Sequence, residues 1–100
     1  MSATLRIASY NIHACRGWDG RQDVDRIAAV LREIEADVIG LQEVESRHGR
    51  STIDQAEALG QALGMACIEG PLLHGARGWY GNALLSRRPV RAVRRVLFED

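Results

Sequence analysis

The spacing of hydrophobic residues changes twice within the first half of the chain. Residues 5–11 and 37–44 are rich in strand-forming residues, and the second segment contains a nearly continuous apolar run. Between them, apolar residues recur at helical spacing behind an expected N-cap at Asp23: Val24, Ile27, Ala28, Leu31 and Ile34. The pattern predicts a strand–helix–strand unit, and such crossovers place their two strands parallel and often side by side.

A similar apolar stripe predicts a second helix over residues 52–63. Ser51 with Asp54 resembles a capping box, and Gly64 suits the turn that ends a helix. Residues 65–69 are expected to form the next strand. The chain therefore continues to alternate between helix and strand after its first unit.

Glycine and proline dominate the segment that follows. Residues 70–81 contain four glycines and one proline with little hydrophobic periodicity, which predicts a surface loop. Two more strands are expected after this loop, at residues 82–86 and 89–98, joined by a tight turn. We expect the strand that starts at residue 82 to lie in the sheet beside the first two strands.

The composition is that of an ordinary globular chain, with 46% hydrophobic and 26% charged residues. The 13 basic and 13 acidic residues balance, which argues against a nucleic-acid-binding domain that depends on bulk charge. No export signal is visible, and no apolar stretch approaches the roughly 20 residues needed to cross a bilayer. We therefore expect a cytoplasmic protein without a transmembrane segment, in which the widely separated Cys15 and Cys67 are reduced.

Two polar side chains stand at the ends of the first two predicted strands. Asn11 closes the first strand, and Glu43 lies near the end of the second. Because the carboxyl ends of neighbouring parallel strands meet at one edge of a sheet, we expect these side chains to lie close together. An amide and a carboxylate supply the oxygen ligands that Mg²⁺ prefers. The sequence therefore predicts part of a metal-dependent enzyme.

Three strings carry a further signal: Ser9-Tyr10-Asn11-Ile12-His13, Asp37-Val38-Ile39-Gly40-Leu41-Gln42-Glu43-Val44 and Gly81-Asn82-Ala83-Leu84-Leu85-Ser86-Arg87. Their order and spacing resemble those of the endonuclease/exonuclease/phosphatase superfamily, and of its bacterial branch in particular. The likeness extends from residue 5 to about residue 97. One such string is weak evidence, but three in register are specific.

The resemblance implies a four-layered α/β sandwich that hydrolyses a phosphoester with Mg²⁺ or Mn²⁺. Glu43 matches the metal-binding glutamate of the family, and Asn11 matches the asparagine that helps to hold the metal or the scissile phosphate. His13 occupies a position that varies among relatives, and it either donates to a phosphate oxygen or caps local backbone groups. The implied substrate is a phosphoester of nucleic acid, phospholipid or a small molecule.

The later part of the family's pattern does not occur in this sequence. Relatives complete their site with an Asp-x-Asn string, which orients the attacking water, and with a Ser-Asp-His string near the carboxyl end. We therefore expect residues 1–100 to be the amino-terminal portion of one such domain, competent for hydrolysis only in a longer chain. Part of a sandwich would also leave an apolar sheet face uncovered, which favours self-association.

The glycine-rich segment is expected to flank the catalytic edge and to recruit substrate. Arg77, Trp79, Tyr80 and Asn82 are the predicted substrate-binding residues, because an arginine grips phosphate and an aromatic ring packs on an apolar or base moiety. The alternative is that Trp79 and Tyr80 only anchor this segment to the core.

Three alternatives to a metal-dependent phosphoester hydrolase arise from the sequence. A non-catalytic binding module that keeps the same scaffold stays open as the alternative. A dinucleotide-binding unit is disfavoured because residues 14–20 lack the G-x-G-x-x-G pattern. A nucleophilic Cys15 is also disfavoured, because His13 is the only candidate catalytic partner near it in the sequence.

Overall fold

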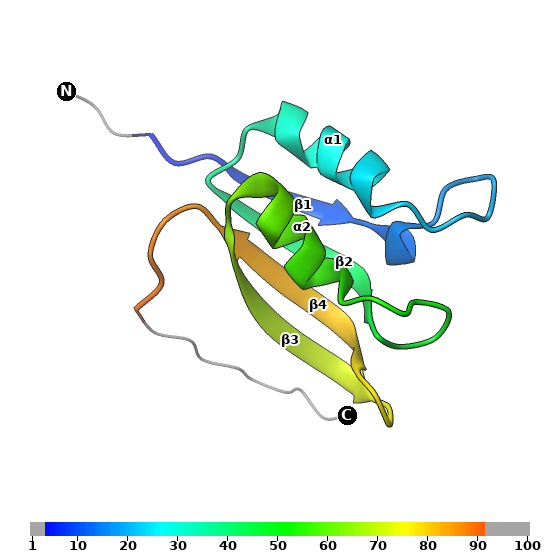
Figure 1. Cartoon of the computed structure of the whole chain (residues 1–100). Helices are drawn as coiled ribbons and strands as arrows, with labels where there is room; N and C mark the ends of the chain where they lie inside the picture. Colours follow the sequence, from blue (N-terminus) through cyan, green and yellow to red (C-terminus); the bar gives the residue numbers. More distant parts are fainter. Residues whose placement is uncertain (1–3, 92–100) are drawn as a thin grey trace, which may run out of the picture.

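The protein is described here by a computed structural model, which covers residues 4–91. Its elements are β1 (Ile7–Asn11), the short 3-10 helix η1 (His13–Cys15), α1 (Val24–Ile34), β2 (Val38–Ser46), α2 (Gln55–Leu63), β3 (Ala66–His74) and β4 (Trp79–Ser86). Both α-helices lie across the same face of the sheet (Figure 1). The predicted strand–helix–strand opening is confirmed.

The four strands form one mixed sheet in the order β1-β2-β4-β3. β1 and β2 are parallel neighbours, as the crossover predicts, with Ile7 beside Val38 and Asn11 beside Gln42. β4 runs antiparallel to both β2 and β3. The first residues of β4 therefore lie beside the last residues of β2.

Aspartates cap both helices at their N-terminal ends. The Asp23 carboxylate accepts a hydrogen bond from the Arg26 N–H at 3.1 Å, and the Asp54 carboxylate accepts one from the Glu57 N–H at 3.0 Å. Each carboxylate satisfies a donor that the helix leaves unpaired. Gly64 ends α2 in the left-handed conformation, with φ of 67°, as expected from the sequence.

The predicted start of the second helix at residue 52 is wrong. α2 begins at Gln55, and its cap is Asp54 rather than Ser51. The Ser51 hydroxyl instead donates to the Ile53 carbonyl at 2.9 Å and accepts from the Ile53 N–H at 3.3 Å. The serine therefore closes a local turn, which competes with helix formation at these residues.

The predicted loop over residues 70–81 is also wrong. β3 continues to His74 and β4 begins at Trp79, so that only residues 75–78 connect the two strands. A hydrogen bond of 2.8 Å from the Gly75 N–H to the Gly78 carbonyl closes this connection. The two strands therefore form a long hairpin that ends near the carboxyl edge of β2.

The proline and glycines in this segment serve the hairpin rather than a loop. Pro71 lies in β3, an edge strand of the described sheet, where a missing N–H is tolerated. At Gly81, an added Cβ would lie 2.6 Å from the Gly70 carbonyl oxygen and from the Leu72 nitrogen. Glycine is needed there because the two backbones approach closely at a register shift in the hairpin.

The last predicted strand, at residues 89–98, lies mostly outside the described residues. Pro89, Val90 and Arg91 are described, and they form no strand. The strand predicted at residues 82–86 is confirmed as part of β4.

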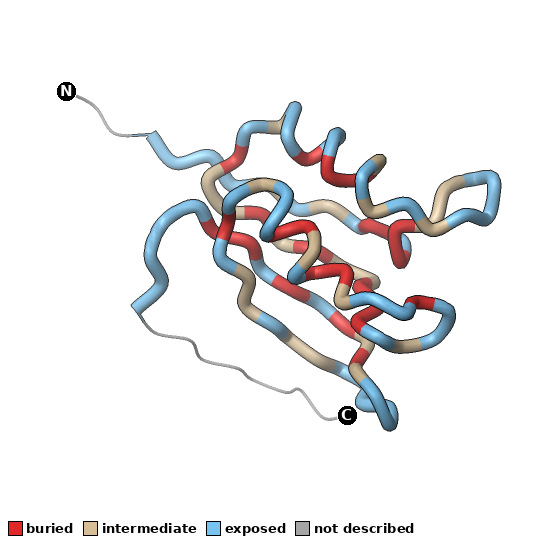
Figure 2. The backbone as a smooth tube through the Cα atoms, viewed as in Figure 1, coloured by how far each residue is buried: buried red, intermediate tan, exposed pale blue. Residues whose placement is uncertain are grey.

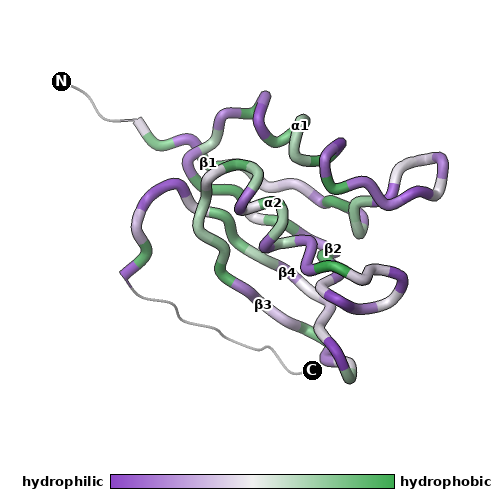
Figure 3. Tube along the Cα trace, in the orientation of Figure 1, coloured by the Kyte–Doolittle hydropathy of each residue, from purple (hydrophilic) through white to green (hydrophobic). Residues whose placement is uncertain are grey.

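The hydrophobic core lies between the sheet and the two helices, where Figure 2 shows the buried positions gathered. Its largest fully buried apolar side chains come from both layers and from the chain after β1: Ile12, Leu31, Ile39, Leu41, Leu59 and Leu85. The connecting segments 16–22 and 47–52 are mainly hydrophilic (Figure 3). No helix within residues 4–91 is long and apolar enough to cross a membrane.

The other face of the sheet is not covered by either helix (Figure 1). Ile7 is 70% exposed and Leu84 is 37% exposed on this face. Two apolar side chains are therefore exposed on this face, but an apolar face large enough to drive association stays an expectation. Self-association through this face stays a prediction.

Candidate active site at the carboxyl edge of the sheet

The last residues of β1 and β2 lie next to each other at one edge of the sheet. Asn11 is the register partner of Gln42, and the Ile12 N–H donates to the Gln42 carbonyl at 3.1 Å. Glu43 is the next residue of β2. The structure therefore brings Asn11 and Glu43 to the same edge, as the parallel crossover requires.

A β-bulge in β2 turns Glu43 away from the core. Gln42 and Glu43 together lie opposite the single residue Asn82 of β4. Leu41 and Val44 on either side are both fully buried, and Glu43 adopts a left-handed conformation with φ of 55°. In a regular strand, Glu43 would face the helices like Leu41, because residues two apart share a face. The extra residue of the bulge instead places the Glu43 carboxylate at the edge of the sheet.

The turn after β1 is held in an unfavourable backbone conformation. His13, Ala14 and Cys15 have φ values of 50°, 54° and 57°. Left-handed backbone costs non-glycine residues roughly 1–2 kcal/mol each. The Asn11 side-chain oxygen accepts from the His13 N–H at 2.9 Å, and the Cys15 N–H donates to the Ile12 carbonyl at 2.8 Å. Such strain persists only where surrounding contacts hold it, and it concentrates at functional sites.

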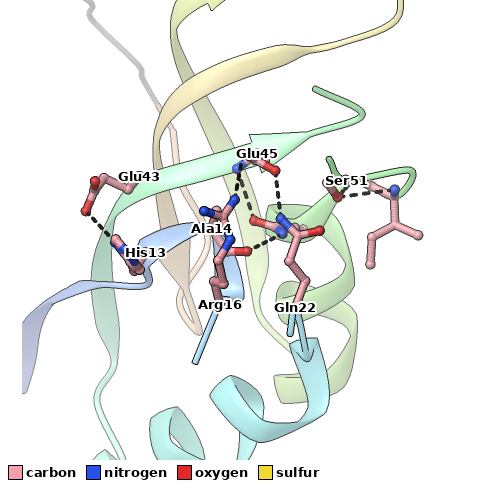
Figure 4. Close-up of polar contacts among 9 residues, drawn as sticks. His13, Ala14, Arg16, Gln22, Glu43, Glu45 and Ser51 are labelled. Carbon is pink, nitrogen blue, oxygen red and sulfur yellow. Dashed lines mark hydrogen bonds and ion pairs between the residues drawn. The ribbon is translucent and has the colours of Figure 1, made fainter. Parts of the chain in front are cut away.

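The side chains of His13 and Glu43 face each other across this edge (Figure 4). The His13 Nδ1 lies 3.7 Å from the Glu43 Oε2, and the two side chains are 67% and 39% exposed. The Asn11 oxygen has a second lone pair beyond the one that holds the turn. Asn11, His13 and Glu43 therefore form an open polar cluster that a ligand can reach.

Glu45 lies two residues further along β2, but it belongs to a buried network (Figure 4). Only 8% of the residue is exposed. Its carboxylate accepts from the Gln22 Nε2 at 2.8 Å and lies 3.7 Å from the Arg16 Nη2. The buried Gln55 side chain accepts from the Glu45 N–H at 3.0 Å and donates to the Ala14 carbonyl at 2.7 Å.

The motifs of the sequence do not predict this buried network. One available signal is Gln55, a polar residue four positions before the fully buried Leu59 and thus on the inner face of α2. A polar side chain at such a position requires buried hydrogen-bond partners.

Tyr80 lies close to the polar cluster. Burial raises the pKa of its hydroxyl above the usual value, and the negative charges of Glu43 and Glu45 raise it further. Its ring centroid is 6.1 Å from that of His48, in a tilted arrangement. Asn82 is exposed and lies opposite the bulge. Tyr80 and Asn82 are therefore placed at the candidate site.

Trp79 and Arg77 occupy different environments. Trp79 is only 6% exposed and packs in the hydrophobic core, so it anchors β4 in this structure and presents no free ring. Arg77 is exposed in the short hairpin connection. The hairpin connection reaches this edge because Trp79 pairs with Ser46 at the end of β2.

A sequence profile of the Endonuclease/Exonuclease/phosphatase family matches residues 8–100. This chain belongs to that family. Among solved structures, it is similar to the endonuclease/exonuclease/phosphatase from Beutenbergia cavernae DSM 12333, with 30% sequence identity and a TM-score of 0.63. It also has the fold of an endonuclease/exonuclease/phosphatase family protein from Leptotrichia buccalis C-1013-b, with 19% identity and a TM-score of 0.62. A search of curated proteins found no similar sequence.

The chain spans a minor part of both solved endonuclease/exonuclease/phosphatase structures. Each match covers 89% of this chain, but only 27% of the first structure's chain and 40% of the second's. The described sheet and helices agree with the mixed α/β fold of this family. Hydrolases that use divalent metal ions are typical of the family.

The donor chemistry at the edge suits the divalent metal of an endonuclease/exonuclease/phosphatase enzyme. Glu43 offers a carboxylate and Asn11 a carboxamide oxygen, and Mg²⁺ is often held by one or two protein oxygens while it keeps several waters. Within residues 4–91, no group of three or more His, Cys, Asp or Glu side chains is placed to hold a metal ion. The described residues therefore fit an ion that remains largely hydrated.

The two thiols do not have the properties of catalytic nucleophiles. Cys15 is buried, and this burial, followed by the charges of Asp23 and Glu45, raises the pKa of its thiol to about 12. Cys67 is half-buried, and burial raises the pKa of its thiol to about 11. Both thiols stay protonated near neutral pH, and neither forms a disulfide.

A cleft is also present elsewhere among the described residues. It has a volume of about 440 Å³ and opens between the N-terminal ends of α1 and α2, where Asp23, Asp25 and Arg50 line it. The candidate site is instead an open edge. The strained backbone and the strand-end donors Asn11 and Glu43 make the edge the stronger candidate site.

Proposed function

We propose that this protein hydrolyses phosphoester bonds with a divalent metal ion bound at the carboxyl edge of β1 and β2. One observation carries the proposal: the left-handed bulge aims Glu43 out of the core, toward His13 and the end of β1. Membership of the endonuclease/exonuclease/phosphatase family supports this reaction class.

Each residue of the edge has a chemical role in this proposal. Glu43 and Asn11 hold Mg²⁺ or Mn²⁺ through oxygen atoms, and the bound metal supplies Lewis-acid stabilisation of phosphoryl charge. His13 donates a hydrogen bond from a ring N–H to a phosphate oxygen. The cation of Arg77 and the polar groups of Tyr80 and Asn82 bind substrate beside the edge; these three are supplied by the β3–β4 hairpin.

The substrate is a phosphoester of nucleic acid, phospholipid or a small molecule. Because the chain has 13 basic and 13 acidic residues, an anionic substrate must be gripped by local groups rather than by overall charge. Arg77 is such a group at the hairpin connection. The buried Trp79 is not assigned to substrate binding.

The first experiment measures hydrolysis of bis(p-nitrophenyl) phosphate by the full-length protein. EDTA should abolish the activity, and Mg²⁺ or Mn²⁺ should restore it. Glu43→Gln should lower kcat by about a hundredfold or more, because the neutral amide keeps the shape but loses the charge that holds the metal. The melting temperature should change little, since the Glu43 side chain is 39% exposed and its contact with His13 is 3.7 Å long.

Glu35→Gln is the matched control for this experiment. Glu35 is also a glutamate with positive φ, 54°, and it is exposed, but it caps α1 at the opposite end of the sheet. Its substitution should leave the activity unchanged. Full activity in EDTA, or in Glu43→Gln, would contradict the proposed function; inactivity of the metal-loaded wild type would favour the non-catalytic binding module.

A further inference from the structure

The two segments that carry the candidate site lie far apart in sequence and need a link between them. One segment is the left-handed turn at residues 13–15, which bears His13. The other is the end of β2, which bears Glu43. Neither conformation is favoured by its residues alone, so contacts from elsewhere must hold the two segments in register.

One side chain reaches both segments. Gln55, the first residue of α2, is 1% exposed. Its carboxamide oxygen accepts from the Glu45 N–H at 3.0 Å, and its Nε2 donates to the Ala14 carbonyl at 2.7 Å. Ala14 follows His13 directly, and Glu45 is two residues beyond Glu43. Gln55 therefore joins the middle of the strained turn to the strand end beside the bulge.

We propose that Gln55 is a positioning residue for the candidate active site, an inference that rests on the proposed function. Its amide holds the His13 turn at a fixed distance from the Glu43 strand end. The side chains of His13 and Glu43 are 67% and 39% exposed and approach only to 3.7 Å, so their own contact is too weak to fix this geometry. The buried amide supplies the constraint that the exposed pair lacks.

The chemistry of the amide explains why glutamine suits this position. A carboxamide offers a donor and an acceptor in one plane, which matches one carbonyl and one N–H on two different segments. Methionine has a similar length but offers neither group with comparable strength. The position of Gln55 is itself fixed, because Asp54 caps the helix from the preceding residue.

The turn is also held from a third direction. The Asp23 N–H donates to the Cys15 carbonyl at 2.8 Å, at the start of α1. The turn therefore has partners at both helix starts, and loss of Gln55 removes only one of them. A Gln55 variant is expected to loosen the turn without unfolding the domain.

The test compares amide hydrogen exchange in the metal-free protein for the wild type and Gln55→Met. The Cys15 and Arg16 N–H groups report on the turn, since they donate to the Ile12 and His13 carbonyls. Their exchange should become about tenfold faster relative to the N–H of the buried Leu41, the size expected for a lost buried hydrogen bond. Leu59→Ala is the control, because it destabilises α2 from a fully buried position that has no hydrogen bond to the turn.

Kinetics on the full-length protein give a readout that a purely structural role would not move. Gln55→Met should lower kcat about tenfold and leave KM within about twofold, because misplaced catalytic groups slow the chemical step. Leu59→Ala, measured at a temperature where it is folded, should keep kcat. This split between the two variants would support the positioning role.

Two outcomes would overturn the proposal. One is turn exchange in Gln55→Met that is no faster than in Leu59→Ala; the other is faster exchange with unchanged kcat. Exchange is measured without metal or substrate, so it does not depend on activity. Failure of the proposed function would instead appear as a wild-type protein that hydrolyses nothing.

Discussion

The two ends of the β1–β2 pair differ sharply in how their backbones are built. Of the six non-glycine residues with positive φ in the described chain, five lie at the carboxyl edge, namely His13, Ala14, Cys15, Glu43 and Arg47. The opposite end has only Glu35, which caps α1. There, the Arg6 N–H donates to the Asp37 carboxylate at 2.9 Å, and the Asp37 N–H donates to the Arg6 carbonyl at 2.8 Å.

This difference shows what the polar edge requires from the rest of the fold. Exposing Glu43 while Leu41 and Val44 stay buried needs a bulge, and aiming His13 at it needs a strained turn. Both features cost free energy, which the buried hydrogen bonds of Gln55 and Glu45 help to offset. The opposite end has no comparable run of strained residues, and the two hydrogen bonds between Arg6 and Asp37 hold its strands together.

The largest effect on stability is expected for Trp79, a core residue at the start of β4, next to the end of β2. Trp79 pairs with Ser46 and His74 and is 6% exposed. Trp79→Ala should lower the free energy of unfolding by about 3–5 kcal/mol, because it removes a large buried ring and leaves a cavity. Urea unfolding followed by circular dichroism measures this loss.

Arg77→Ala tests the exposed connection two residues before Trp79. Arg77 is exposed, so its substitution should change stability by less than about 0.5 kcal/mol while raising KM for an anionic substrate. Equal losses of stability in the two variants would contradict this division between an anchoring tryptophan and a binding arginine. So would an unchanged KM in Arg77→Ala.

A smaller effect on stability is expected at alkaline pH, and it comes from Cys15 in the turn after β1. The folded protein raises the pKa of Cys15 from 9.0 to about 12, mainly by burial. The thiol therefore stays protonated in the folded state while the unfolded chain ionises. Its contribution to stability is complete below pH 9 and is lost as the pH rises toward 12. By pH 10, the loss from this group should be about 1.4 kcal/mol.

Cys15→Ala isolates this contribution. Urea unfolding at pH 8 and pH 10 should show a fall in stability that is larger in the wild type than in the variant by about that amount. Comparing the two proteins cancels the other groups that titrate in this range. An equal fall in both proteins would show that the thiol in the turn is not held protonated.

The sequence predicts the scaffold better than it predicts the local geometry of the site. Hydrophobic periodicity and the cap at Asp23 identify the crossover, because these signals are local and repeat over several turns. The bulge depends on how β2 pairs with β4, which lies about 40 residues later in the chain. Its trace in the sequence is the three-residue spacing between the buried Leu41 and Val44.

The errors in the hairpin have a related cause. The local preferences of Gly70, Pro71 and Gly81 predict a loop, although strand pairing places these residues in β3 and β4. The same preferences predict Trp79 in an exposed loop, whereas the pairing of β4 places it in the core. The roles proposed for Asn11, His13, Glu43, Arg77, Tyr80 and Asn82 stay predictions.

The edge formed by Asn11 and Glu43 is proposed to bind a divalent metal ion. Substoichiometric Mn²⁺ should broaden the amide NMR signals of Asn11, His13 and Glu43 first, since paramagnetic broadening falls steeply with distance. The signals of Glu35 and Ser86, at the far end of the sheet, should stay sharp, and Glu43→Gln should remove the effect. Broadening centred on the Asp23 and Asp25 cleft, or unchanged in Glu43→Gln, would contradict metal binding at this edge.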